Sequence, residues 1–134
     1  MSSSGVGPFE NDSALDLVDE IRGLSGDAVL NALREALIAA IDVEPGDYLD
    51  RDLGEPAVAA SALVLAKAQS REDVLERLEL AAILPRVPIT LVALVTPALD
   101  RVMQDDSEVY GLWLDVGRGE EWKAGVRRLL TQAR

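Results

Sequence analysis

The side chains that could carry chemistry in this chain are almost all carboxylates. Aspartate and glutamate together number 24, lysine and arginine number 13, and the sequence contains no histidine and no cysteine. Nucleophilic catalysis of the Ser-His-Asp or Cys-His kind, and metal sites built on histidine or thiolate, are therefore excluded. Acid–base catalysis would need several carboxyl groups that converge in one cleft and perturb each other's pKa. No residue is predicted to be catalytic.

The densest group of acids lies in an acidic loop predicted at residues 42–55. The stretch "DRDLGE" (50–55) resembles the start of a calcium-binding EF-hand loop, but its glycine comes one position early. It also lacks the third acidic position and the glutamate at position 12 that such a loop requires. We therefore expect these acids to be solvated rather than to hold a divalent cation, and we predict no metal and no cofactor.

A second candidate is the stretch "GVGPFENDSALDLVDEI" (5–21), in which two glycines and a proline lead into a helix start. Such a loop can hold a phosphate when it follows a strand and presents free backbone amides. Here no strand precedes Gly5, and the acids at 10, 12 and 16 would repel an anion. Asn11 or Asp12 is expected to be the N-cap of the helix instead. Phe9 is expected to fill a core position.

Charge is distributed unevenly along the chain. Residues 1–60 contain 13 acidic and 3 basic residues, a balance of −10, whereas residues 61–134 contain 11 and 10, a balance of −1. Nucleic acid and anionic membrane surfaces are therefore not expected as partners, because both would repel this chain. The acidic half could attract a basic protein by long-range steering.

The elements that must position these acids are predicted to be helices. Apolar residues recur at helical spacing in most of the chain, and one stretch (56–69) is apolar almost all round, which is typical of a central helix. Pro56 suits the first turn of that helix. Trp113 and Trp122 lie on apolar stripes and are expected in the core. The stripes run over residues 14–24, 29–41, 56–69, 89–103, 109–116 and 122–130.

Two stretches leave alternatives open. Ser70 and Asp73 have the spacing of a capping box, but residues 70–90 read either as helix or as irregular structure. The run "ITLVALV" (89–95) is rich in β-branched residues, so that a strand competes there with a helix that is kinked or started afresh near Pro97. We favour the helix. The fold prediction is an all-α protein: one compact bundle of about six to seven short helices over residues 1–134, with an N-terminal arm at 1–10.

The sequence resembles a bacterial family known only as domain of unknown function 4259. The resemblance rests on "GVGPFENDSALDLVDEI", on "GDYLD" (46–50), on the alanine-rich stretch 57–68, and on residues 101–130. Members usually carry a tryptophan before the first glycine, where this chain has serines, and often another where Leu17 stands. Residues 70–90 fit least well. The resemblance implies a small helical fold and supplies no activity.

These observations predict a cytoplasmic, non-enzymatic protein-binding module that uses its acidic N-terminal half to bind a basic protein. The alternatives are an immunity-type inhibitor of a basic toxin and, third, a hydrolase that depends on carboxylates or a divalent metal. The oligomeric state is left open. The residues proposed to contact the partner are Glu10, Asp12, Asp47, Asp50 and Asp52.

Overall fold

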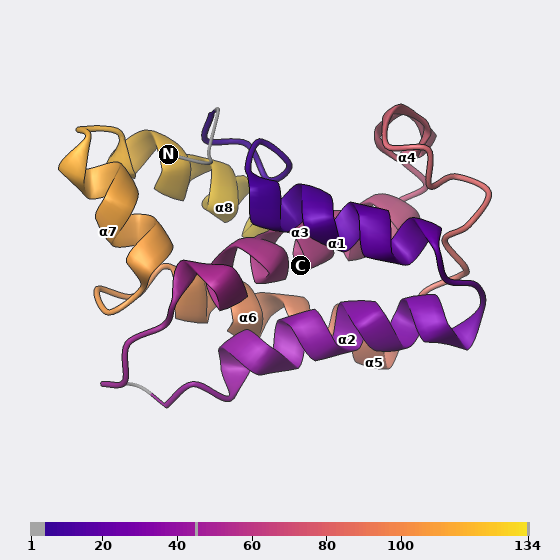
Figure 1. Ribbon diagram of the computed structural model, residues 1–134, viewed down its shortest axis with the longest axis horizontal. Helices are drawn as coiled ribbons and strands as arrows, with labels where there is room; N and C mark the ends of the chain where they lie inside the picture. The colour runs from indigo at the N-terminus through magenta and orange to yellow at the C-terminus, as the bar shows by residue number, and fades with distance from the viewer. Residues whose placement is uncertain (1–4, 45, 134) are drawn as a thin grey trace.

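The computed structural model describes residues 5–44 and 46–133, and within them the chain forms eight helical segments and no β-strand (Figure 1). The prediction of an all-α bundle is confirmed. One segment, α5, is a single turn of four residues, and the other seven agree with the predicted six to seven helices. In chain order the segments are α1 (Asp12–Arg22), α2 (Asp27–Ile41), α3 (Arg51–Ala68), α4 (Glu72–Arg77), α5 (Ile89–Val92), α6 (Val95–Val102), α7 (Glu108–Asp115) and α8 (Gly119–Ala133).

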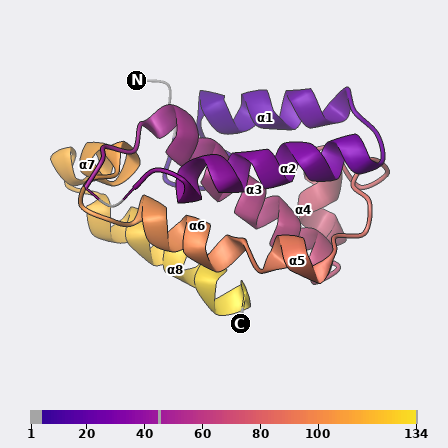
Figure 2. The same ribbon diagram turned by 90° about the horizontal axis from the view of Figure 1, so that it is seen from below.

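Helix α3 is the centre of the fold, as its apolar sequence predicts. Almost all of its residues from Gly54 to Ala66 are buried. Every other helix of the described chain packs against it, and in Figure 2 α1 and α8 lie on opposite sides of it. Small alanine side chains let the surrounding helices approach closely, while leucines and valines fill the space between them.

The start of α3 was predicted wrongly. The helix begins at Arg51, so the predicted loop at 42–55 is shorter than expected and Pro56 lies inside the helix rather than at its first position. The first free amide of the helix, that of Arg51, donates to Glu108 Oε1 at 2.9 Å. This cap comes from α7, far along the chain, which is why the local sequence did not indicate the true helix start.

The sequence left the structure of residues 70–95 undecided, and the stretch contains both helix and irregular structure. Ser70 does not cap α4, because it has a left-handed backbone (φ 56°) and terminates α3 in a Schellman turn, with the Arg71 amide donating to the Ala66 carbonyl. Residues 78–88 form turns and irregular structure. The run at 89–95 is helical and restarts at Val95, so that Pro97 falls in the first turn of α6.

Two aromatic predictions had different outcomes. Trp113 and Trp122 are buried, as expected, and Trp122 stacks on Tyr110 with 5.9 Å between ring centroids. Phe9 packs against the buried core but does not fill a position inside it. It is only half-buried, because the arm at residues 5–10 crosses the surface and packs beside Val74 and Leu78 near α4. Residues 1–4 of the predicted arm lie outside the described residues.

Candidate functional site

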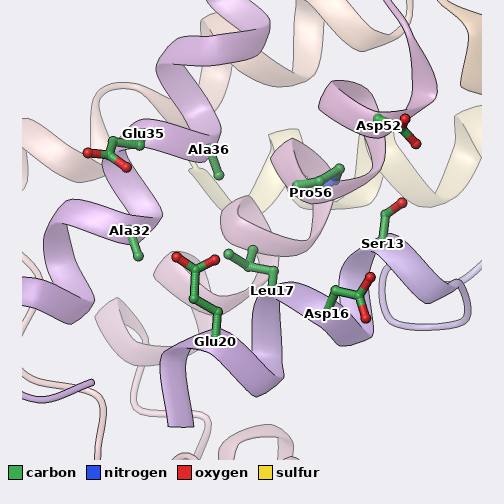
Figure 3. A pocket seen from close by; sticks show the side chains of 9 residues that line it. All are labelled: Ser13, Asp16, Leu17, Glu20, Ala32, Glu35, Ala36, Asp52 and Pro56. Carbon is green, nitrogen blue, oxygen red and sulfur yellow. The ribbon is translucent and has the colours of Figure 1, made fainter. Parts of the chain in front are cut away.

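The main candidate site is an open groove of about 560 Å³ between α1 and α2, closed at one end by the start of α3. Both helices pack on α3, and the groove runs between them (Figure 3). Its apolar floor consists of short or compact side chains: Leu17 of α1, Ala32 and Ala36 of α2, and Pro56 of α3. The two alanines keep this floor low because they reach little beyond the α2 backbone.

Four carboxylates surround this floor, and we call the feature the acidic groove. Asp16 and Glu20 come from α1, Glu35 from α2 and Asp52 from α3, as Figure 3 shows. No basic residue is among the nine that line the groove. Within the described chain, none of the four carboxylates forms an ion pair. The groove therefore presents concentrated negative charge over an apolar base.

The five acids proposed from the sequence do not form one site. Of these, only Asp52 lines the acidic groove, and Asp12 is exposed in the first turn of α1. Glu10 does not line the groove. Its carboxylate lies against Gly5 and Gly7 of the arm, so closely that a Cβ added to either glycine would collide with it. The space that a phosphate would need in this glycine loop is thus taken by the chain's own carboxylate. Asn11 is the N-cap, and its Oδ1 accepts from the Ala14 amide at 2.7 Å.

The two remaining acids, Asp47 and Asp50, belong to a loop that is pinned to α6. The guanidinium of Arg101, which is buried, donates to the carbonyls of Val43 at 2.9 Å and of Asp47 at 2.7 Å. It also pairs with the Asp106 carboxylate at 2.8 Å. The side chains of Asp47 and Asp50 remain exposed, while the main chain of their loop is held in place.

Asp106 completes this arrangement, which we call the Arg101 cluster. The backbone amide of Gly46 donates to Asp106 Oδ2 at 2.9 Å, and the backbone carbonyl of Asp106 accepts from the Leu49 amide. The hydrogen bond from Gly46, together with the charge of Arg101, outweighs partial desolvation and holds the pKa of Asp106 below its usual value. The cluster therefore depends on an ionised Asp106.

Three groove residues were not proposed from the sequence. Asp16 and Glu20 are four residues apart, so they share one face of α1, and Glu35 stands between two alanines of α2. Like charges at this spacing slightly destabilise a helix, which is a signal that was available in the sequence. That Glu35 and Asp52 complete the same groove depends on how α2 and α3 pack, and no local pattern contained that information.

In the parts of the chain that the structure describes, no three carboxylates are arranged so that they could hold a metal ion. None of the helices there is both long and apolar enough to cross a bilayer.

The fold and the groove define a small all-helical protein with an acidic groove, and comparison with known families identifies the family. The model of the domain of unknown function DUF4259 matches residues 2–125, which is nearly the whole chain, and the chain belongs to this family. The resemblance inferred from the sequence is confirmed. No curated protein and no solved structure matched this chain.

Proposed function

We propose that this protein is a non-enzymatic binding module whose acidic groove holds a basic segment of a partner protein. The observation that supports this most directly is the set of four carboxylates, Asp16, Glu20, Glu35 and Asp52, around one groove without a cation from the described residues. Arginine and lysine side chains from a partner would supply the missing charge and the hydrogen-bond donors.

The apolar floor suits the same kind of ligand. Arginine and lysine have long aliphatic stems that pack on apolar surface while their charged ends reach outward. In the groove the stems would lie on Leu17, Ala32 and Ala36, and the charged ends would meet the carboxylates at the rim. The excess of acids in residues 1–60 would also speed the encounter by long-range attraction.

A narrower form of the proposal is an immunity-type inhibitor that covers a basic toxin. The negative charge of the groove favours a basic partner but does not identify which protein that partner is. A cytoplasmic setting is part of the proposal, since the lack of cysteine suits a reducing compartment. The carboxylate-based hydrolase has no specific observation in its favour.

The proposal is tested by measuring the binding of a synthetic peptide in which arginine alternates with leucine. The control is the same peptide with every arginine replaced by glutamate. The groove variant D16N/E20Q/E35Q/D52N removes four charges from the groove. The matched variant D73N/E76Q/D100N/D105N removes four exposed charges that do not line the groove, so both variants have the same net charge.

We expect the arginine peptide to bind the wild-type protein in low salt and to be released as the salt concentration rises. The groove variant should bind at least about tenfold more weakly, because several charge-assisted contacts are lost, while the matched variant should lose much less. Equal losses in the two variants would show that net charge alone attracts the peptide, and the groove would then not be the binding site. The same variant pair, used as bait in pull-downs, extends the test to natural partners.

A further inference from the structure

A second, smaller pocket of about 200 Å³ lies between the N-terminal arm and α8. Its lining is largely apolar: Val6 and Pro8 contribute from the arm, Val58 from α3, and Val126 and Leu129 from α8. Val58 and Val126 are buried, so they form the base of the pocket, whereas the other three are half-buried. This pocket is separate from the acidic groove and shares no residue with it.

Gly125 keeps this pocket open on the α8 side. A Cβ added there would have only one neighbouring group within 4 Å, the Nη2 atom of Arg128 at 3.5 Å. Gly125 lies in the middle of α8, and glycine is a poor helix former, so any other residue except proline would favour the helix more. The glycine therefore leaves space beside the helix at the expense of helix stability.

Arg128 lies at the mouth of the pocket, folded back over Gly125. It is the one charged residue among the nine that line the pocket, and within the described chain its guanidinium has no hydrogen bond or ion pair. Gln132, one turn further along α8, also lines the pocket. A guanidinium and an amide that line one pocket are donors of the kind that bind a carboxylate.

The charge around this pocket permits an anion to approach. The negative charge of the chain is concentrated in residues 1–60, whereas residues 61–134, which include α8, have a balance of only −1. The arm contributes Val6, Gly7 and Pro8 to the lining, and none of these carries a charge. Arg128 is therefore the only charged side chain of the lining, and the Glu10 carboxylate lies against Gly7 from outside it.

We propose that this pocket binds a small carboxylic acid with an apolar body, its carboxylate on Arg128 and Gln132 and its body against Val58 and Val126. The size of the body follows from the volume, because a dry apolar cavity of about 150 Å³ holds a benzene-sized molecule. A pocket of about 200 Å³ that opens at one end then takes a body of roughly six to eight carbon atoms. Aliphatic and aromatic acids of this size share the required chemistry.

The probes are hexanoate and benzoate, titrated into the full-length ¹⁵N-labelled protein and followed by amide chemical shifts. Hexan-1-ol and hexylamine have the same apolar body with a neutral or a cationic head group. We expect saturable shifts at the amides of Gly7, Val58, Gly125 and Val126 with one or both acids. The alcohol should bind about tenfold more weakly, and the amine should not bind, because only a carboxylate pairs with Arg128.

Three variants assign the site. R128Q should weaken binding of the acid about tenfold, whereas R127Q, a change at the exposed neighbour that does not line the pocket, should leave it unchanged. G125L should abolish binding by filling the pocket, and it should remain folded because leucine favours the helix.

Three results would overturn the proposal: no saturable shifts at these amides, an alcohol that binds as well as the acids, or equal losses in R128Q and R127Q. Because the acidic groove is untouched by these variants, failure here leaves the proposed partner binding to be judged by its own test.

Discussion

The four carboxylates of the acidic groove and the carboxylate of Asp106 are the same chemical group in two different surroundings. In the groove, Asp16, Glu20, Glu35 and Asp52 face open space without a cation from the described chain. Asp106 instead accepts hydrogen bonds from the Gly46 amide and from the buried guanidinium of Arg101.

This difference separates charge that is available to a partner from charge that holds the fold. The Arg101 cluster joins three segments, namely the loop after α2, the end of α6 and the turn before α7. Its members satisfy each other, so removing Arg101 leaves the Val43 and Asp47 carbonyls and the Asp106 carboxylate without this donor. The groove carboxylates satisfy nothing within the described chain, so removing one should cost the fold little. Mutations in the two regions should therefore have opposite profiles for stability and binding.

The largest expected effect is that of Arg101→Met. The change keeps an apolar stem of similar length but removes the donors to Val43, Asp47 and Asp106. We expect the free energy of unfolding to fall by about 1.5–3 kcal/mol, because these acceptors lose hydrogen bonds from a charged donor. Chemical denaturation measures this, with Arg127→Met as the exposed control, which should change stability by less than about 0.5 kcal/mol. Similar losses in both variants would mean that the cluster is not a stabilising element.

Asp106→Asn should have the next effect, and it should depend on pH. The pKa of Asp106 is lowered in the folded protein, so its ionised form favours folding above the unfolded pKa of about 3.9. That contribution is lost as the pH falls through the lower, folded pKa. The stability gap between the wild-type protein and Asp106→Asn should therefore be widest near neutral pH and narrow in acid. Denaturation curves over a pH series measure the gap, and a gap that is constant with pH would contradict the assignment.

Asn11→Ala should cost less than the loss of Arg101, because one local hydrogen bond is involved. The Asn11 side chain accepts from the Ala14 amide, and the loss of such an N-cap costs about 1 kcal/mol. Asp12→Ala should cost less than Asn11→Ala, since Asp12 contributes only its charge near the helix N-terminus. Thermal denaturation measures the loss of stability in each variant. A larger loss for Asp12→Ala than for Asn11→Ala would show that Asn11 is not the residue that caps the helix.

The parts of the fold that were predicted correctly depend on local pattern. Helices α1, α2 and α8 have apolar stripes that any neighbouring surface would bury, and α3 is apolar enough to be central whatever surrounds it. The positions of Trp113 and Trp122 followed from the same stripes.

The parts that were missed depend on residues far apart in the sequence. The start of α3 is capped by Glu108, 57 residues after Arg51. Phe9 is half-buried because of where α4 lies relative to the arm. The acidic groove exists because α1 and α2 pack side by side on α3 without closing on each other, and only Asp52 of the five proposed acids happens to lie there. Acid content alone therefore indicated the half of the chain that contributes the carboxylates of the groove and did not identify the groove.

The smallest expected effect on stability, and the sharpest test of the comparison, is that of neutralising the groove. Asp16 and Glu20 repel each other along α1, and neither has a cation partner in the described chain. The combined variant D16N/E20Q/E35Q/D52N should keep its free energy of unfolding within about 0.5 kcal/mol of the wild-type value, or exceed it slightly, because like-charge repulsion is removed. Chemical denaturation of this variant measures its stability, and the peptide titration then measures its binding. A substantial loss of stability would show that the groove carboxylates support the fold in the way that Asp106 does, and the distinction between the two regions would then be lost.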